Sequence, residues 1–288
     1  MGYIYLVIIS IVFSFGGVMI KSARLMVSPE IISFLRFFLG TICLLGILFL
    51  KKEKVKWHVF NKLIWLGAIG KALHYICENY GVAKGFSYGN IIVWPVQSVI
   101  ILLVSIFILK EAITKKKLAG MLLCILGVVF ISWNGVSLEV FLGDSFTLTM
   151  IFVAGGIGSA LFTWVQKKLV DQMSAVESNL SMFSIATVIA LIPVPISGSV
   201  TGKVMPSAIF CILLLGVITG VSFLMISEAM KTVPLFMVSV IQSSTVIFSL
   251  LWALLFFGEP ITQYIIVGTV MFIIGLLCIN LTFEKKKR

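Results

Sequence analysis

Long runs of apolar residues separated by short polar gaps dominate the chain. The runs fall at 3–20, 31–50, 63–83, 90–109 and 118–133, and then at 146–165, 178–195, 208–230, 235–257 and 264–281. An apolar helix of about 20 residues crosses the hydrocarbon layer of a bilayer, and it satisfies its own backbone hydrogen bonds there. The pattern therefore predicts an all-α polytopic membrane protein with ten transmembrane helices.

The amino-acid composition agrees with a lipid environment. Of the 288 residues, 60% are hydrophobic and 11% are charged, and the mean hydropathy is +1.17. Because a soluble domain averages about 25% charged residues, a chain this apolar cannot cover itself with polar surface in water. The 5 cysteines all lie within apolar runs, and an odd number in such positions argues against a disulfide framework.

The net charge of +11 raises the question of nucleic-acid binding, but the positions of the basic residues argue against it. With the amino terminus in the cytoplasm, sixteen of the 22 Lys and Arg residues lie in inner gaps and the tail, four lie in outer gaps, and Arg36 and Lys71 lie within runs. Basic residues gather on the cytoplasmic side of membrane proteins. We therefore expect no nucleic-acid partner, and a multi-pass protein of the cytoplasmic membrane with both termini in the cytoplasm.

The chain repeats itself when it is shifted by about 148 residues. Segment 110–114 (Lys-Glu-Ala-Ile-Thr) overlays 258–262 (Gly-Glu-Pro-Ile-Thr), and Gly120 and Gly127 overlay Gly268 and Gly275. Each half holds five runs, an odd number, so the halves must be inserted in opposite directions. This predicts two inverted-topology repeats, at 1–134 and 145–283, followed by a basic cytoplasmic tail at 284–288. Transporters built from inverted repeats place the solute site near the bilayer midplane, between the repeats.

Several short motifs carry a resemblance to a known family. They are Ser28-Pro29, Leu35-Arg36-Phe37, and the Lys110-Glu111 and Gly258-Glu259-Pro260 turns that lead into the paired glycines. In this arrangement the chain resembles the drug/metabolite transporter superfamily, in particular its EamA-type members with ten spans. The resemblance covers nearly the whole chain and is specific to the superfamily, but it says little about the solute. The chain departs from the pattern at Met182, which corresponds to Arg36, and at Lys110, where the family usually has a small residue.

The third apolar run holds an unusual set of ionisable residues. Lys71, His74 and Glu78 are spaced by three and four, so they share one helix face, and Tyr75 and Asn79 lie beside them. A charge near the bilayer centre costs at least roughly 2.5–3.5 kcal/mol, so such groups usually face a cavity or a partner. One interpretation is a solute site or proton relay around Glu78 and His74. The other is internal neutralisation of Lys71 by Glu78 through His74.

Polar and aromatic residues on other runs are further candidates for a solute site. They are Trp94, Gln97, Trp164, Gln242 and Thr245. Trp94, Trp164 and Tyr75 are candidates for an aromatic wall, whereas small and hydroxyl residues at the same spacing also serve helix packing. Three charged residues are candidates for coupling or charge pairing. Besides Lys71, these are Arg36, which we expect to snorkel or to pair with Glu30 or Glu78, and Glu228, which we expect to pair with Lys231 at the surface.

These features favour a secondary transporter of an amino acid, a metabolite or a drug-like organic cation. No Gly-x-x-x-x-Gly-Lys-Ser/Thr motif is present, so we expect no direct use of ATP and no cofactor, with coupling to protons or to exchange left open. The alternatives are an intramembrane enzyme with a Ser/His or carboxylate site, and a non-transporting sensor or channel. No His-Glu-x-x-His or Gly-x-Ser-x-Gly motif supports a metal or a catalytic residue. The charge of the solute, the direction of transport, and a monomeric or homodimeric state all stay open.

Overall fold

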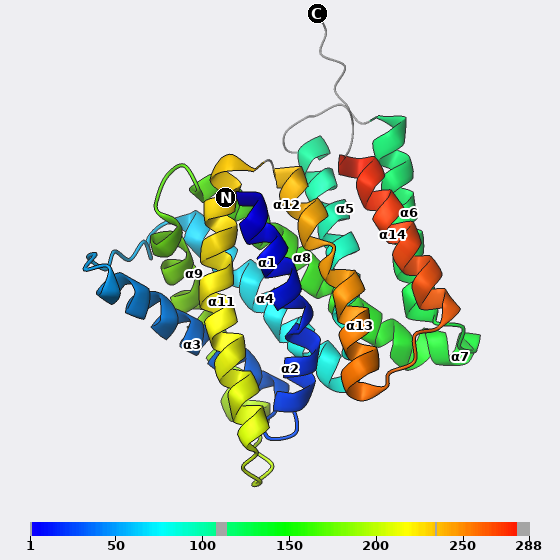
Figure 1. The fold of residues 1–288 in the computed structure, drawn as a ribbon, viewed down its shortest axis with the longest axis horizontal. Helices are drawn as coiled ribbons and strands as arrows, with labels where there is room; N and C mark the ends of the chain where they lie inside the picture. Colours follow the sequence, from blue (N-terminus) through cyan, green and yellow to red (C-terminus); the bar gives the residue numbers. More distant parts are fainter. Residues whose placement is uncertain (1, 108–113, 234, 281–288) are drawn as a thin grey trace, which may run out of the picture.

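The protein is a bundle of helices (Figure 1). In the computed structural model, which describes residues 2–107, 114–233 and 235–280, every predicted apolar run is largely helical over its described residues. Within that part, six stretches are long and apolar enough to cross a membrane: Gly2–Ala23, Pro29–Leu50, Lys115–Trp133, Leu138–Leu169, Ala175–Ser197 and Pro206–Thr232. Three shorter apolar helices lie at Gly89–Val104, Thr245–Phe257 and Gln263–Ile279. The prediction of an all-α fold is confirmed for the described residues.

The first half of the chain comprises α1 (Gly2–Ser14), α2 (Gly16–Ala23), α3 (Pro29–Leu50), α4 (Lys62–Lys84), η1 (Gly89–Ile92), α5 (Val93–Phe107) and α6 (Lys115–Trp133). Two runs differ from single uninterrupted α-helices. The run at 3–20 is interrupted at Phe15, and the run at 90–109 begins in the 3-10 turn η1. Residues 108–113, which include Lys110 and Glu111 of the repeated motif, lie outside the described residues.

The second half comprises α7 (Leu138–Val140), the π-helical turn η2 (Phe141–Ser145), α8 (Phe146–Leu169), α9 (Ala175–Leu191), α10 (Val194–Ser197), α11 (Pro206–Thr232), α12 (Leu235–Gln242), α13 (Thr245–Phe257) and α14 (Gln263–Asn280). The run at 178–195 ends early as α9, because Pro193 cannot donate the backbone hydrogen bond that would continue the helix. The run at 235–257 is split between α12 and α13. The basic tail at 284–288 lies outside the described residues.

Side-chain caps and one glycine set where several helices begin and end. Asn61 caps α4 by accepting a backbone N–H at 2.9 Å, and Ser174 and Glu177 form a capping box at the start of α9. Gly258 ends α13 with a φ of 61°, in the left-handed region that glycine adopts without strain. This turn directs the chain after α13 back toward the bundle, where Glu259 is buried.

The two ends of the bundle are marked by polar contacts between helix ends. At one end, Lys21 of α2 forms an ion pair with Glu259, which follows α13. At the other end, Lys167 Nζ near the end of α8 donates to the carbonyl oxygen of Met230 near the end of α11, at 3.0 Å. We call these the Glu259 end and the Met230 end.

The two halves are interlocked rather than side by side. α4 packs along α8, α3 packs against α9 and α11, and α6 lies along α14 (Figure 1). A Cβ on Gly120 would lie 2.6 Å from the carbonyl oxygen of Gly275, and a Cβ on Gly127 would lie 2.7 Å from that of Gly268. Small residues allow membrane helices to approach this closely. The sequence repeat equates Gly120 with Gly268 and Gly127 with Gly275, so exchanging the halves converts one contact into the other.

The close contact between α6 and α14 can be tested with one methyl group. We expect Gly120→Ala to destabilise the protein by about 1–3 kcal/mol, because the added Cβ overlaps the backbone of Gly275. The control is Gly46→Ala on α3, where no atom lies within 4 Å of an added Cβ. Melting temperatures of the two variants in the same detergent provide the measurement. Equal melting temperatures would show that the two helices are not in backbone contact.

Candidate functional site

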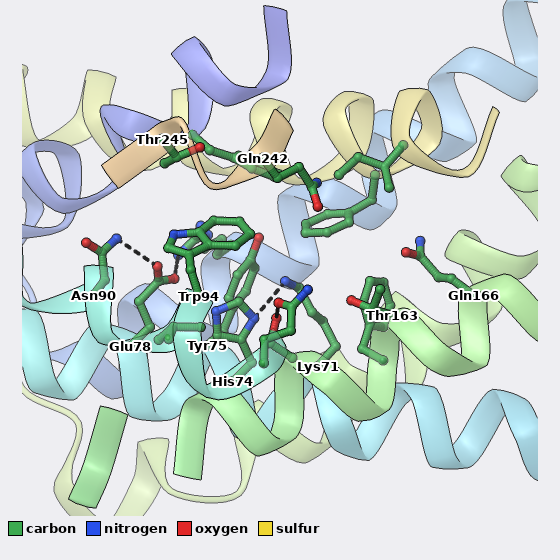
Figure 2. A pocket seen from close by; sticks show the side chains of 18 of the residues that line it. Lys71, His74, Tyr75, Glu78, Asn90, Trp94, Thr163, Gln166, Gln242 and Thr245 are labelled. Carbon is green, nitrogen blue, oxygen red and sulfur yellow. Dashed lines mark hydrogen bonds and ion pairs between the residues drawn. The ribbon is translucent and has the colours of Figure 1, made fainter. Parts of the chain in front are cut away.

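A polar cavity lies in the middle of the bundle, between helices of the first half (α1, α3, α4, η1 and α5) and of the second half (α8, α11, α12 and α13) (Figure 2). Its volume is about 40 Å³, room for roughly three water molecules. The lining residues are Phe13, Arg36, Lys71, His74, Tyr75, Glu78, Asn90, Val93, Trp94, Gln97, Ser159, Phe162, Thr163, Gln166, Phe223, Ile226, Met230, Gln242 and Thr245. Both halves thus contribute polar and aromatic side chains to one space.

Arg36 and Glu78 form a buried ion pair in the cavity wall. Arg36 Nη1 lies 2.9 Å from Glu78 Oε2, and their side chains are only 4% and 10% exposed. The other carboxylate oxygen of Glu78 accepts a hydrogen bond from Asn90 Nδ2 at 3.1 Å, drawn in Figure 2. Arg36 also donates to Asn79 Oδ1 and to Thr219 Oγ1, each at 3.2 Å. The pairing of Arg36 with Glu78, one of the two partners expected, is confirmed, and the Glu78 carboxylate is neutralised within the protein.

Lys71 lies one helical turn from His74 and faces aromatic rings. Its Nζ is 3.0 Å from His74 Nδ1, a hydrogen bond whose donor depends on the tautomer of the ring. The same Nζ lies 3.9 Å from the ring centroids of Tyr75 and Phe223. The neutralisation of Lys71 by Glu78 through His74, which was one of the two interpretations of the sequence, does not form because Glu78 pairs with Arg36.

Amide and hydroxyl groups supply the remaining polar lining. Ser159 Oγ of α8 donates to Gln97 Oε1 of α5 at 2.6 Å, so this contact joins the two halves. Thr245 Oγ1 donates to a backbone carbonyl of α1 at 3.2 Å. Gln166 and Gln242 also line the cavity, and Figure 2 shows Thr163 beside Gln166. These neutral groups can donate and accept hydrogen bonds but add no charge.

Most residues predicted for the site line this cavity, and three do not. Asn79 is fully buried behind the ion pair, where it accepts from Arg36. Trp164 packs against the apolar core and lies outside the lining. Glu228 pairs with Lys231 at 2.8 Å at the surface, which confirms the expected ion pair and places Glu228 away from the cavity.

The sequence did not reveal the apolar wall of the cavity. Phe13, Phe162 and Phe223 form much of it. The chain contains 23 phenylalanines, and the sequence alone does not distinguish a phenylalanine that lines a cavity from one that packs in the core. Gln166 and Thr163 did carry a signal, because they share a helix face with Ser159, but the same spacing is also typical of helix packing.

The Glu259 end of the bundle is closed by a cluster of polar contacts. The Glu259 carboxylate pairs with Lys21 and accepts from the backbone N–H and the hydroxyl of Ser87, at 2.9 Å and 2.8 Å. Beside it, a Cβ on Gly17 would lie 1.9 Å from the carbonyl oxygen of Ser87, so α2 touches the turn before η1. The cluster joins three segments: α2, the turn before η1, and the loop after α13.

A second hollow lies between α5, α6 and α8. Its volume is about 330 Å³, larger than the central cavity, and apolar side chains make up nearly all of its lining. The two hydroxyl residues in it, Ser132 and Thr149, are hydrogen-bonded to each other. A hollow of this kind offers no group to orient a polar solute, so the smaller central cavity is the candidate site.

A model of the EamA-like transporter family matches the chain over residues 1–133 and 146–281. The chain belongs to the EamA-like transporter family. The resemblance noted from the motifs is thereby confirmed, and the protein is a multi-pass membrane protein of a transporter family. Membership in this family indicates a transporter rather than an enzyme.

Relatives of this family member are named as transporters in several organisms. The chain is 32% identical over 145 residues to "Uncharacterized transporter YetK" of Bacillus subtilis, covering 49% of this chain and 44% of that protein. It is 25% identical over 174 residues to "Uncharacterized transporter" of Archaeoglobus fulgidus, covering 60% and 59%. Those two matches span less than two thirds of each relative. It is 27% identical over 244 residues to "Uncharacterized inner membrane transporter YhbE" of Escherichia coli, covering 81% and 74%.

A solved structure shows the same fold at low sequence identity. A protein crystal structure with 13% identity superimposes on this family member with a TM-score of 0.71, covering 97% of this chain and 98% of the other. The arrangement of helices is therefore shared well beyond recognisable sequence similarity.

The buried ion pair can be tested with a double-mutant cycle. We expect Arg36→Met, which installs the residue found at the corresponding position 182, to destabilise the protein by about 3–5 kcal/mol because it leaves Glu78 buried without a partner. Glu78→Gln in the same chain should restore much of the loss. Melting temperatures of the two single variants and the double variant measure the coupling. Additive effects would show that the two side chains do not interact.

Proposed function

We propose that the chain is a secondary transporter that carries a small organic solute across the cytoplasmic membrane by alternating access. The observation that carries this proposal is the central cavity, a polar space inside an apolar bundle whose walls come from both halves. Ionisable side chains inside a membrane protein mark solute and ion pathways. His74, beside Lys71, is the candidate for proton coupling, with solute exchange as the alternative.

The proposed topology has ten spans in two oppositely inserted repeats of five, at 1–134 and 145–283. The two stretches matched by the family model and the reciprocal glycine contacts between α6 and α14 support it. The gap at 51–62 and the last turn of α8 are rich in lysine and lie at the Met230 end. By the bias of basic residues toward the cytoplasm, that end and both termini lie inside.

Alternating access requires the cavity to widen. A volume of about 40 Å³ is too small for an organic solute, so the walls must separate before one can enter. At the outer end, the contact that must separate is the cluster of Lys21, Glu259 and Ser87. Because it joins both halves, breaking it allows one half to move relative to the other.

The cavity itself can be blocked to test transport. A solute is first chosen by screening amino acids, organic cations, organic acids and nucleosides for a rise in the melting temperature of the purified protein. We expect Ser159→Phe to abolish both that rise and saturable uptake of the labelled solute into proteoliposomes, because the ring fills the cavity. The matched control is Ile157→Phe, on the exposed face of the same helix.

Three outcomes would contradict the proposal. Equal uptake by both variants would exclude the cavity as the pathway. Currents of many ions per opening event would indicate a channel. Conversion of the solute into a product within the cavity, with no net movement across the bilayer, would indicate an enzyme.

The outer closure can be tested separately from transport. We expect Glu259→Gln to speed the reaction of a cysteine placed at Val93 with a membrane-impermeant maleimide added from outside, since the ion pair that closes this end is lost. The native cysteines are replaced beforehand. Glu139→Gln, at an exposed site of the same end, is the control and should leave the rate unchanged. Unchanged labelling in both variants would show that the cluster does not close the pathway.

A further inference from the structure

The central cavity holds one basic side chain that has no carboxylate partner among the described residues. Its ionisable lining residues are Arg36 from α3 and Lys71, His74, Tyr75 and Glu78 from α4. Arg36 and Glu78 neutralise each other. Within residues 2–107, 114–233 and 235–280, no carboxylate oxygen lies within 4.0 Å of Lys71 Nζ. The other lining residues are neutral, so Lys71, when it is protonated, is the one charge of the lining without a counter-ion.

The surroundings of Lys71 stabilise a cation only in part. Its side chain is 1% exposed, so water does not solvate it. When Lys71 is protonated, His74 Nδ1 accepts one of its hydrogen bonds, and the faces of Tyr75, Phe223 and Phe162 lie at 3.9, 3.9 and 5.1 Å. The Tyr75 ring is already shared with the guanidinium of Arg36 at 3.5 Å, which adds a second positive charge nearby. An ammonium has three donors, and a buried charge is stable when it has a counter-ion.

We infer that Lys71 binds the carboxylate of a small organic monoanion, an inference that rests on the proposed transport function. The solute supplies the missing counter-ion, and its carboxylate completes the donor set of the Lys71 ammonium. The apolar part of the solute packs against Phe162 and Phe223, which stand around the same ammonium. A monoanion pairs with the ammonium of Lys71, which lowers the cost of holding either charge in the low-dielectric interior of the membrane.

The geometry disfavours an organic cation and an α-amino acid. Glu78, the acidic residue of the lining, already holds Arg36 with one oxygen and Asn90 with the other. It follows Lys71 by seven residues, about 10 Å along the helix. The carboxylate and ammonium of an α-amino acid sit on a single carbon, so they cannot reach Lys71 and Glu78 together. An ammonium group bound near Lys71 would add a further positive charge to an unpaired one.

A series of ligands with matched skeletons tests the preferred charge. The probes are acetate, butyrate and benzoate, with the amide and the primary amine of each skeleton, and phenylalanine as the zwitterion. The rise in melting temperature of the purified wild-type protein is measured for each probe. We expect the carboxylates to stabilise the protein more than their amides and amines, and more than phenylalanine. The inference is overturned if no carboxylate exceeds its own amide, or if an amine or phenylalanine stabilises more.

Two lysine variants of α4 assign the effect to one residue. We expect Lys71→Met to raise the Kd of the best carboxylate about ten- to hundredfold, the loss of one charge-assisted hydrogen bond. Its melting temperature without ligand should not fall, because no acid of the described chain depends on Lys71. Lys84→Met, at the end of the same helix, should leave the Kd unchanged. Equal Kd values in the two variants would overturn the role of Lys71, whereas the wild-type series stands even if Lys71→Met fails to fold.

Transport assays separate this inference from the proposed function. If wild-type proteoliposomes transport a cation or a neutral solute but no carboxylate, the transport function holds and the inference about Lys71 fails. If the carboxylates bind through Lys71 but never cross the bilayer, the binding site holds and the transport function fails.

Discussion

A charged group inside a membrane protein requires a partner, and this requirement organises the centre of the bundle. α4 carries Lys71, His74 and Glu78 on one face, and α3 adds Arg36. Among the described residues that line the cavity, Glu78 is the one acid available to these basic groups, and it pairs with Arg36. Asn79 accepts a hydrogen bond from Arg36, and Asn90 donates one to Glu78. The pairing of α3 with α4 thereby fixes the position of the cavity. It also leaves Lys71 without a carboxylate partner among the described residues, with aromatic rings around its amino group.

The cavity exists because the two halves interlock without filling the space between them. Backbone contacts through glycine bring α6 against α14 at the edge of the bundle, and α4 against α8 near its centre. Around the central cavity, larger side chains such as Trp94 and Phe223 lie between the helices, and a small space is left among them. The contacts around Glu259 then close one end. The proposed solute site and its proposed closure therefore lie in the same interface between the halves.

The sequence predicted the helical class, the family and most of the polar lining, because these depend on local composition and spacing. Lys71, His74 and Glu78 were conspicuous as charges within an apolar run. The sequence left Glu30 and Glu78 open as partners of Arg36, because these residues come from helices whose packing cannot be read from residue spacing. Helix packing also decides which aromatic residues face the cavity. Trp164 was predicted for the site but packs against the core, whereas Phe13 and Phe223 were not predicted and line the cavity.

The most direct test of the account is the position of a heavy-atom ligand in an experimental structure of the protein. Crystals grown with 4-bromobenzoate would locate the bromine through its anomalous scattering. We expect one peak in the central cavity, with the carboxylate against Lys71 and the ring beside Phe162 and Phe223. A peak confined to the larger apolar hollow between α5, α6 and α8, with the central cavity unchanged, would contradict the account.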